Sequence, residues 1–509
     1  MKKIFPALLL ALLMLCTGCA QQSQSPPTVC TTHTDRDDNG ACDTCRISVL
    51  ERVLLFSVND LHGKVADGET HIGVDEMTTY LKQQKAHNKN TILLSAGDMW
   101  QGSWESNLTK GKLPTEWMNE LDFAAMTLGN HEFDWGEDPI AANAELAEFP
   151  FLAINVYQRD TDTLADYCQP SVLVDLGAVQ VGIIGAIGDC YSSISADKTR
   201  DIYFKTGREL TSLVKAEALR LRTQGADCVV YVLHDGYGES KSASGVDVTD
   251  RELASYYDTI LSTGYVDLVF EGHTHQRYLL EDSYGVYHLQ NGGDNRGLSR
   301  ATVLINTANG KIDVADAQLI AGGAYAQMED DPIVETLLDR YADEIELGTR
   351  ELGICSSQQD RDALRQLLAD LYYQTGIKTW GKEYDIVLGG GFLSVRSPGY
   401  LPAGSVTYAD LQGLFPFDNP LVLCSIKGRD LWSKFFATNN SNYFISYGNY
   451  GAQVRDQIDM DKTYYVVTDT YSSLYAPNNL TEVARLSDKI FARDLLADYI
   501  AAGGLQSGN

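Results

Sequence analysis

The sequence is short of positive charge and has no long apolar segment. Of its 509 residues, 40 are Lys or Arg and 69 are Asp or Glu, which gives a formal net charge of −29 at pH 7. Charge of this sign repels the phosphate backbone of nucleic acids, so nucleic-acid binding is not predicted. Beyond the N-terminus, no uninterrupted run of about 18 apolar residues occurs, and no membrane-spanning helix is predicted.

Cysteine and histidine are also scarce, with ten and nine residues. Five cysteines are scattered through the body of the chain, an odd number that argues against a disulfide framework: Cys168, Cys190, Cys228, Cys355 and Cys424. The composition, 44% hydrophobic, 10% aromatic and 21% charged, is that of a folded globular protein. Because a single core stops growing near about 250–300 residues, the length predicts two domains.

The N-terminus has the pattern of an export signal. Lys2 and Lys3 precede a largely apolar run, and Leu15-Cys16-Thr17-Gly18-Cys19 resembles a bacterial lipobox with Cys19 as the lipid acceptor. We therefore expect a lipoprotein signal peptide over residues 1–19, a tether over 20–50, and a membrane contact through the lipid anchor alone, at the cell surface or in the periplasm. The alternative is an ordinary signal peptide that is cleaved nearby and leaves Cys19 as a thiol.

A second cluster of cysteines lies within the 20–50 tether. Cys30, His33, Cys42 and Cys45 have the spacing of a metal knuckle, two short chelating pairs separated by a loop, and a small structural Zn²⁺ site is one interpretation. A Cys42/Cys45 redox pair and an unliganded linker remain alternatives. Within the loop, Asp35 begins a segment like the start of a calcium loop, but Arg46 stands where the twelfth-position glutamate is expected. No catalytic role is assigned to this segment.

From Val53 to about Ile320, short apolar runs alternate with polar helical stretches, the pattern of an α/β domain. Five of the runs end in residues that bind metals. In open α/β sheets, ligands gather at the carboxyl ends of strands, so these five ends are expected to meet at one site. The runs are 53–58, followed by Asp60 and His62; 91–95, by Asp98; 124–128, by Asn130 and His131; 228–233, by His234; and 266–270, by His273 and His275.

The spacing within the ends supports one metal centre. In extended backbone, residues i and i+2 point to the same side, so Asp60 with His62, and His273 with His275, can each face one ion. Five of the nine histidines fall at these ends, a concentration that core or surface histidines do not explain.

The successive motifs resemble those of the calcineurin-like metallophosphoesterases, in the bacterial branch of 5′-nucleotidases, 2′,3′-cyclic-nucleotide phosphodiesterases and UDP-sugar hydrolases. The motifs are 59–63 (NDLHG), 97–103 (GDMWQGS), 129–136 (GNHEFDWG) and 272–275 (GHTH). The resemblance implies an α/β fold: a four-layer α/β/β/α sandwich over 51–325 and a smaller α+β substrate-binding domain over 353–509. Between them, apolar residues at helical spacing over 329–348, with Asp331-Pro332 as the helix start, predict a linker helix over 326–352.

Carried over residue by residue, the resemblance implies a dinuclear site. Asp60, His62 and His275 would hold one divalent ion, Asn130, His234 and His273 the other, and Asp98 would bridge them. Family members often have Gln in place of His275, and an imidazole suits Zn²⁺, Mn²⁺ or Fe²⁺ more than Mg²⁺. Two such ions clamp a phosphoryl group and lower the pKa of a shared water for in-line attack on phosphorus. His131, oriented by Asp134, would stabilise the developing charge and protonate the leaving oxygen.

The C-terminal half resembles the nucleotide-specificity domain of that family. Arg396 follows a glycine-rich strand and would contact substrate phosphate; four residues, 392–395, separate it from the glycines, whereas the family usually places the Arg two residues after them. Within 415–419 (FPFDN), Phe417 would stack on the base and Asn419 would bind its edge. Tyr471 would be the second stacking residue. The Gly-Gly-Asp-Gly-Tyr stretch that normally follows, with its ribose contact, is replaced by 472–477 (SSLYAP).

The expected function is a metal-dependent phosphohydrolase of the 5′-nucleotidase type outside the cytoplasm, with a small-molecule nucleotide as substrate. Within the family, a 2′,3′-cyclic-nucleotide phosphodiesterase or a UDP-sugar hydrolase is the alternative. A surface nucleotide-binding lipoprotein without turnover is the alternative from another class, although a pure binder has no need of seven metal ligands and a His/Asp pair. The sequence specifies neither the physiological nucleotide nor an oligomeric state.

Overall fold

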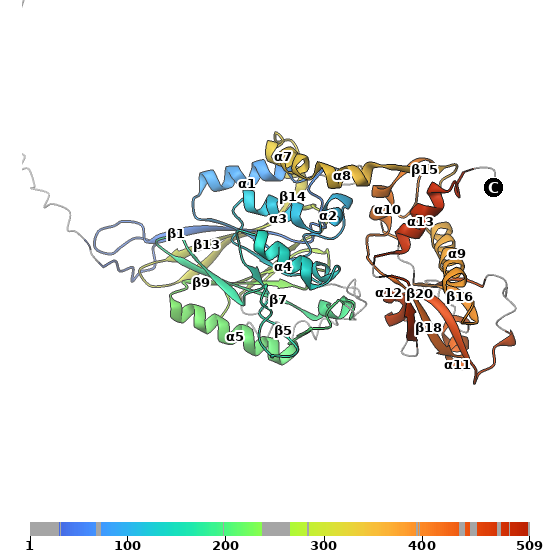
Figure 1. Cartoon of the computed structure of the whole chain (residues 1–509). Helices are drawn as coiled ribbons and strands as arrows, with labels where there is room; N and C mark the ends of the chain where they lie inside the picture. The colour runs from blue at the N-terminus through green and yellow to red at the C-terminus, as the bar shows by residue number, and fades with distance from the viewer. Residues whose placement is uncertain are drawn as a thin grey trace, which may run out of the picture.

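The computed structural model describes residues 30, 32–67, 73–196, 198–236, 265–281, 285–392, 395–396, 398–436, 443–447, 456–475, 480–487 and 489–506. Figure 1 shows a larger N-terminal domain, coloured blue to yellow, beside a smaller C-terminal domain in orange and red. The expected lipid acceptor, Cys19, lies outside the described residues.

The first sheet of the larger domain is built around β1, whose side chains alternate between two apolar faces. Val53 and Leu55 point to one side, and Leu54, Phe56 and Val58 to the other, so both faces of the strand are buried. β1 pairs parallel with β2 and antiparallel with β13. In spatial order the six strands are β14 (Ile312–Ala321), β13 (Gly297–Asn306), β1 (Leu50–Val58), β2 (Thr91–Ser95), β3 (Ala125–Thr127) and β4 (Phe151–Leu152).

The second sheet packs face to face on the first. Its central strands, β9, β7 and β10, run parallel, so their carboxyl ends lie at one edge. In spatial order the six strands are β11 (Arg277–Glu281), β12 (Tyr287–Asn291), β10 (Leu268–Glu271), β9 (Cys228–His234), β7 (Gln180–Ile187) and β6 (Ser171–Asp175). A separate pair joins β5 (Val156–Gln158) to β8 (Ile202–Phe204).

Helices cover the outer face of each sheet and complete the predicted four layers (Figure 1). One core lies between the sheets, a second lies beneath α1, α3, α4 and α7, and a third lies beneath α5. Each fully buried Leu or Val in them contributes about 1.5–3 kcal/mol by leaving water. The helices are α1 (Asp75–His87), α2 (Trp104–Leu108), α3 (Lys112–Glu120), α4 (Glu137–Leu146) and α5 (Gly207–Gln224), with 3₁₀ turns η1 (His131–Phe133), η2 (Asp189–Ser193) and η3 (Gly322–Ala324).

The segment between the domains differs from the single helix expected over 326–352. It forms two helices, α7 (Pro332–Arg340) and α8 (Ala342–Thr349), that meet at Tyr341. Asp331 caps α7 by accepting the N–H of Ile333. The helices separate because α7 packs on α1 and α3 whereas α8 packs on α2, where the missing side chain of Gly348 admits the ring of Trp104.

The C-terminal domain is a five-stranded sheet with helices on both faces. α9 and α13 cover one face, and α11 with a π-helical turn, η4, packs against the other. The sheet order is β19 (Tyr443–Ser446), β16 (Ile386–Phe392), β20 (Thr463–Asp469), β18 (Leu421–Lys427) and β21 (Thr481–Arg485), and β15 (Glu351–Cys355) pairs separately with β17 (Gly404–Thr407). The helices are α9 (Arg361–Trp380), α10 (Tyr408–Leu414), α11 (Gly428–Leu431), η4 (Trp432–Phe436), α12 (Thr470–Tyr475) and α13 (Ala492–Ala501).

A polar and aromatic contact joins the two domains near the sheet ends. Lys110 of the larger domain lies 2.7 Å from Asp418, which is also paired with Arg493 of its own domain. The rings of His131 and Phe417 stack across the same boundary, with centroids 5.9 Å apart. The loop that carries Phe417 and Asp418 is thus held from both sides.

Among the helices that the structure describes, none combines the length and the apolar character that a bilayer crossing requires.

The ion pairs of Asp418 predict a pH-dependent contribution to stability. Burial raises the pKa of Asp418, but Arg493 and then Lys110 outweigh it and lower the pKa below the ordinary 3.8. A carboxyl with a depressed folded pKa stabilises the fold above its unfolded pKa, and this stabilisation is lost as the pH falls through the folded value. Asp418→Asn leaves Arg493 buried without its counter-charge and is expected to lower the free energy of unfolding by about 3 kcal/mol at pH 7.

Urea unfolding of the full chain between pH 7 and pH 3 measures this difference, which should hold from pH 7 to about pH 5 and shrink as the pH falls further. Lys110→Met is the matched control: its side chain is 42% exposed, so the loss should be under about 1 kcal/mol. Equal losses for the two variants would contradict the dominant role of the pair between Asp418 and Arg493.

Candidate metal centre and substrate cleft

The predicted ligands follow the carboxyl ends of β1, β2, β3, β9 and β10, and backbone hydrogen bonds tie these ends together. The N–H of Asp60 donates to the carbonyl of Gly97, and the N–H of His62 donates to that of Asp98, both at 3.0 Å. The N–H of His131 donates to Oδ1 of Asp98 at 2.8 Å. The N–H of His273 donates to Oδ1 of Asp60 at 3.0 Å, and Nδ1–H of His234 donates to the carbonyl of Ala96 at 2.6 Å. The five strand ends therefore converge on one place, although 215 positions separate Asp60 from His275.

Most of the candidate ligands have backbone in the left-handed region, which residues other than glycine rarely adopt. A residue held there costs about 1–3 kcal/mol and persists only where its surroundings fix it. Five of the seven candidates share this conformation: Asp60 (φ 50°), His62 (φ 51°), Asp98 (φ 55°), His273 (φ 72°) and His275 (φ 53°). Strain concentrated in this way marks a functional site.

The first group consists of Asp60, His62 and His275, whose ligand atoms all lie within 4.8 Å of one another. Nε2 of His62 is 3.0 Å from Nε2 of His275, which is 3.4 Å from Oδ1 of Asp60. Nδ1–H of His62 donates to the carbonyl of Gln101 at 2.6 Å and so turns Nε2 toward the group.

The second group surrounds His234. Its Nε2 lies 3.2 Å from Oδ1 of Asn130 and 3.2 Å from Oδ2 of Asp98. Nδ1–H of His234 donates to the carbonyl of Ala96 at 2.6 Å, the backbone contact that orients a metal-binding imidazole. The ring of His273 is 5.5 Å from that of His234, and Asp60, Asp98 and His234 themselves form a close group.

The electrostatics of both groups favour ionised carboxylates. Burial alone raises the pKa of Asp60 and Asp98, but His275 lowers that of Asp60 and His234 lowers that of Asp98, so each ends below its ordinary value. Burial lowers the pKa of His62 to about 3 and that of His273 to about 4. Burial also lowers the pKa of His234, but Asp98 outweighs it and raises the value to about 10.

Two orphaned atoms test whether the residues fit a metal. Nε2 of His273 is buried and makes no hydrogen bond within the described part of the chain, and buried Oδ2 of Asp98 has its ion-pair contact with His234 at 3.2 Å but no hydrogen bond there. Leaving a buried polar atom unpaired costs about 1–3 kcal/mol, more for a charged group, and native proteins avoid it. Cations bound at the centre would give both atoms a partner, and a donor set of carboxylates and imidazoles suits Zn²⁺, Mn²⁺ or Fe²⁺.

His131 lies beside the ligands without joining either group. Its Nδ1–H donates to Oδ2 of Asp134 at 2.7 Å, which leaves Nε2 for a substrate atom. Burial lowers the pKa of His131, but Asp134 and Asp98 outweigh it, and the pKa ends above its ordinary value. The predicted His/Asp pair is therefore formed as a hydrogen-bonded unit.

Sequence reasoning assigned no role to two residues near the centre. The buried carboxylate of Glu132 accepts the N–H groups of Asp98, Met99 and Gly129 at 2.6–2.9 Å and so holds two ligand loops together. Burial and the charge of Asp98 raise the pKa of Glu132 to about 7. Cys190 groups with His234 and His273. Glu132 adjoins His131 in the third motif and could have been noticed, whereas Cys190 lies in η2 outside every motif.

A cleft of about 480 Å³ joins the metal centre to the C-terminal domain, a volume that suits a nucleotide-sized ligand. Its walls combine both kinds of predicted residue. From the first domain they include His62, Asp98, Asn130, His131, Asp134, His273 and His275, and from the second Arg396, Phe417, Asn419 and Tyr471.

The predicted substrate contacts surround an aromatic wall. The guanidinium carbon of Arg396 lies 4.9 Å from the ring centre of Phe417. Tyr471 lies 6.2 Å, between ring centres, from Phe392, a cleft residue that sequence reasoning did not identify. Its position directly after the glycine-rich segment was the available signal.

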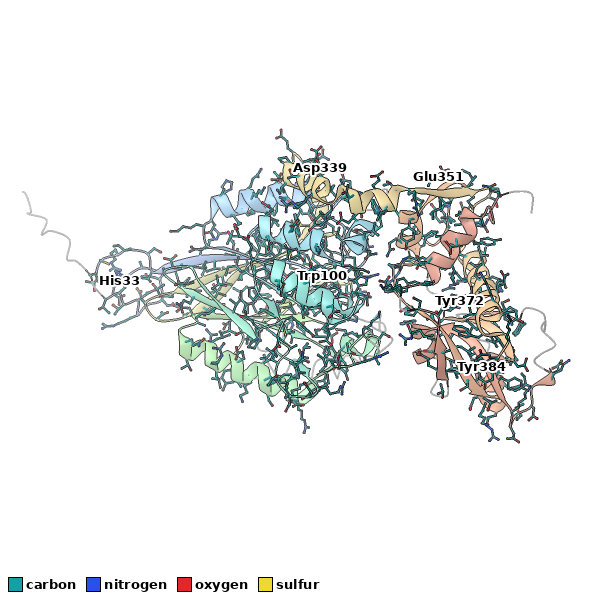
Figure 2. The ribbon with its side chains drawn as sticks, viewed as in Figure 1. His33, Trp100, Asp339, Glu351, Tyr372 and Tyr384 are labelled. Carbon is teal, nitrogen blue, oxygen red and sulfur yellow. The ribbon has the colours of Figure 1, made fainter. Side chains whose placement is uncertain are left out.

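The four residues of the predicted knuckle, Cys30, His33, Cys42 and Cys45, also lie together. They sit at the end of the larger domain that faces away from the C-terminal domain, where Figure 2 labels His33. They take no part in the cleft.

Two protein-family models match the chain. The model described as calcineurin-like phosphoesterase matches residues 55–277, and the model described as 5′-nucleotidase, C-terminal domain, matches residues 341–477. The first range contains every candidate ligand of the dinuclear centre. The second contains the four predicted substrate contacts.

Individual proteins match over most of the chain. An apyrase from Aedes albopictus is 26% identical over 444 residues, which cover 76% of this chain and 72% of the relative. A snake venom 5′-nucleotidase from Naja atra is 26% identical over 420 residues, with 75% and 77% covered. The crystal structure of a 5′-nucleotidase precursor from Thermus thermophilus has the same fold, with a TM-score of 0.63 at 20% identity over 89% of this chain and 96% of that one.

The orphaned atoms predict that metal binding stabilises the fold. Adding Mn²⁺ to the chelator-stripped full chain should raise its melting temperature. At a thousandfold excess of Mn²⁺ over its Kd, the free energy of unfolding should rise by about 4 kcal/mol. Asp98→Asn removes the negative charge that would bridge the two ions and should abolish most of the rise in melting temperature. Calorimetry measures both, with His87→Asn, at an exposed helix position, as the matched control. An unchanged rise in Asp98→Asn would contradict this assignment.

Proposed function

Because the chain belongs to the calcineurin-like phosphoesterases that carry a 5′-nucleotidase C-terminal domain, and is thus a phosphoric ester hydrolase, we propose that it releases phosphate from nucleoside 5′-monophosphates. The observation that carries this proposal is the shared cleft. One wall holds the candidate metal ligands with the His131–Asp134 pair, and the other holds the aromatic residues with Arg396. A nucleotide that spans the cleft reaches both walls with its two ends.

Asp60, His62 and His275 would hold one divalent ion, and Asn130, His234 and His273 the other, with Asp98 between them. When bound, such a pair of ions neutralises phosphate charge and lowers the pKa of bound water toward neutrality. The net charge of −29 then does not exclude an anionic substrate, because the ions dominate the local field.

The protein's own contribution centres on His131. Asp134 accepts its Nδ1–H, so the ring is fixed in one orientation and Nε2 faces the cleft. From there Nε2 would donate a proton to the 5′-oxygen of the leaving nucleoside. Buried surroundings keep bulk water from competing with this transfer. Glu132 is a positioning residue, since it holds the backbone of the ligand loops and touches no substrate.

The second wall would recognise the nucleoside. Phe417 and Tyr471 offer π-surfaces for a base, and Asn419 offers both a donor and an acceptor to its edge. The Arg396 guanidinium would attract substrate phosphate. The absence of an acidic residue at 472–477 removes the expected ribose contact, and we infer a broader nucleoside preference than a strict 5′-nucleotidase has.

We also propose that the mature protein is exported and anchored by a lipid on Cys19. The charged residues Lys2 and Lys3, the apolar run after them and the Gly18-Cys19 junction support this location.

Removal of His131 should separate chemistry from metal binding. His131→Ala is expected to lower kcat for AMP by about 10²–10⁴-fold, the usual contribution of a general acid. Its Mn²⁺ content should stay that of the wild type, because no ligand is lost. Phosphate release and metal analysis measure the two effects, with His87→Ala as control and a chelator abolishing activity in every variant. If turnover and metal content both match the wild type, the role given to His131 is wrong.

Truncation of Phe417 should change substrate selection and not chemistry. Phe417→Ala is expected to weaken transition-state binding of AMP by about 1–3 kcal/mol while leaving bis-p-nitrophenyl phosphate, which lacks a nucleobase, nearly unaffected. The readout is kcat/KM over AMP, UDP-glucose, 2′,3′-cyclic AMP and simple phosphomonoesters. Phe444→Ala is the matched control, because Arg365 covers that ring as Arg396 covers Phe417, but outside the cleft. Unchanged relative rates in Phe417→Ala would refute base stacking.

A further inference from the structure

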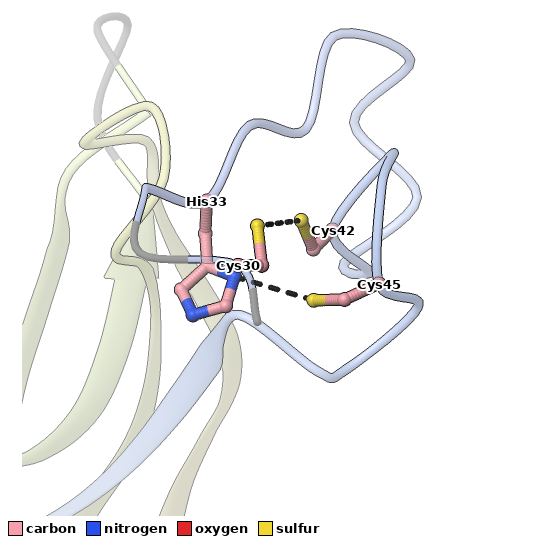
Figure 3. A group of neighbouring side chains, drawn as sticks. All are labelled: Cys30, His33, Cys42 and Cys45. Carbon is pink, nitrogen blue, oxygen red and sulfur yellow. Dashed lines mark hydrogen bonds between the residues drawn. The ribbon is translucent and has the colours of Figure 1, made fainter. Parts of the chain in front are cut away.

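Four potential metal ligands meet at the start of the described chain, far from the catalytic cleft. Sγ of Cys30 lies 3.7 Å from Sγ of Cys42, and Sγ of Cys45 lies 3.4 Å from Nδ1 of His33 (Figure 3). One ligand atom from each of the four residues lies within 4.8 Å of all the others. The sequence spacing therefore closes into a single cluster in space.

The separations are those of the edges of a tetrahedron around zinc. With Zn–S bonds of about 2.3 Å and Zn–N bonds of about 2.0–2.1 Å, a tetrahedral site places two sulfurs about 3.8 Å apart and a sulfur and a nitrogen about 3.5 Å apart. The two observed distances fall within about 0.1 Å of these values. A disulfide needs sulfurs at about 2.05 Å, and the cysteines in the described residues are unpaired.

The loop that carries the cluster has almost no apolar core of its own. In the segment from residue 32 to residue 49, the buried residues are Asp35, Gly40, Cys42 and Val49, and Ile47 is 61% exposed. A segment of this size cannot bury enough apolar surface to order itself and normally needs a cross-link or a metal. The cluster of Cys30, His33, Cys42 and Cys45 supplies a position for such a metal.

The acidic residues of the loop serve a different purpose. Asp35 accepts the N–H groups of Asn39 and Gly40 and the side-chain amide of Asn306, at 2.8–3.0 Å. Lys311, in the β13–β14 turn that follows Asn306, pairs with Asp38. These bonds dock the loop onto the turn and occupy the Asp35 oxygens with protein donors, which explains the segment that resembles a calcium loop.

We propose that Cys30, His33, Cys42 and Cys45 bind one structural Zn²⁺, through three thiolates and Nδ1 of a neutral His33. Binding releases the three thiol protons to solvent and involves no change of oxidation state. The bound ion would fix the loop against the β13–β14 turn, at the end of the larger domain where the polypeptide leads into β1. This site is separate from the dinuclear centre in place and in donor type: three of its four ligands are cysteines, whereas the seven candidate ligands of the dinuclear centre are carboxylate, amide and imidazole groups.

Cobalt substitution of the full chain tests the proposal, because thiolate ligands alone give an intense charge-transfer band in the near ultraviolet. The wild type, kept reduced, should show this band together with tetrahedral d–d bands. Cys42→Ser/Cys45→Ser should lose the band and one equivalent of zinc per chain while still hydrolysing AMP. Asp98→Asn should keep the band, so failure of the knuckle and failure of the hydrolase are distinguishable.

Cys355→Ser, at a buried cysteine elsewhere, is the matched control and should keep the band. If the double variant does not fold, titration of wild-type thiols with an organomercurial should release one zinc per chain. The proposal is overturned if the wild type shows no thiolate–cobalt band, if the band survives in the double variant, if the titration releases no zinc, or if mass spectrometry finds these cysteines joined as disulfides without zinc.

Discussion

The centre of this molecule depends on compensating the charge of two buried carboxylates. Asp60 and Asp98 are both inaccessible to solvent, and a carboxylate so placed is costly unless donors or cations face it. The N–H of His273 points at Asp60, and the N–H of His131 points at Asp98. Apart from its ion-pair contact with His234, Oδ2 of Asp98 nevertheless makes no hydrogen bond within the described residues. Bound divalent cations would complete this compensation, and metal loading and fold stability would then be linked properties of the same residues.

The scaffold around these carboxylates offsets an unfavourable backbone. Five candidate ligands are in the left-handed region, and isolated loops would relax from it. Here the loops continue strands that are buried on both faces, between two sheets that share one apolar core. Glu132 adds a second restraint by accepting N–H groups from two of the loops. Rigid sheets and a buried carboxylate together hold the ligand atoms in place before any ion arrives.

The sequence predicted the catalytic layers better than the connections between them. Thr91–Ser95 and Cys228–His234 are recognisable because continuous apolar runs end abruptly in metal-binding residues. The prediction of a single linker helix was wrong. The periodicity over 329–348 shows an apolar stripe, but it does not show that the two halves of this segment pack on different neighbours. Glu132 and Phe392 were missed although each adjoins a recognised motif, whereas Cys190 groups with His234 and His273 through contacts between separate segments that no local pattern records. The placement of Phe417 against His131 depends likewise on how two separately folded cores meet.

The loop of the C-terminal domain that contacts the larger domain has a further consequence through Asp418, which lies between Phe417 and Asn419 in the sequence. Its partner Arg493 is 5% exposed, so bulk ions barely reach that bond, whereas Lys110 is 42% exposed and is open to screening. Dissolved salt therefore weakens the ion pair between Lys110 and Asp418 and has little effect on the ion pair between Arg493 and Asp418. At high ionic strength the loop would stay folded on its own domain, while its contact with the neighbouring domain weakens. The ionic composition of the surroundings would therefore control how tightly the two domains associate.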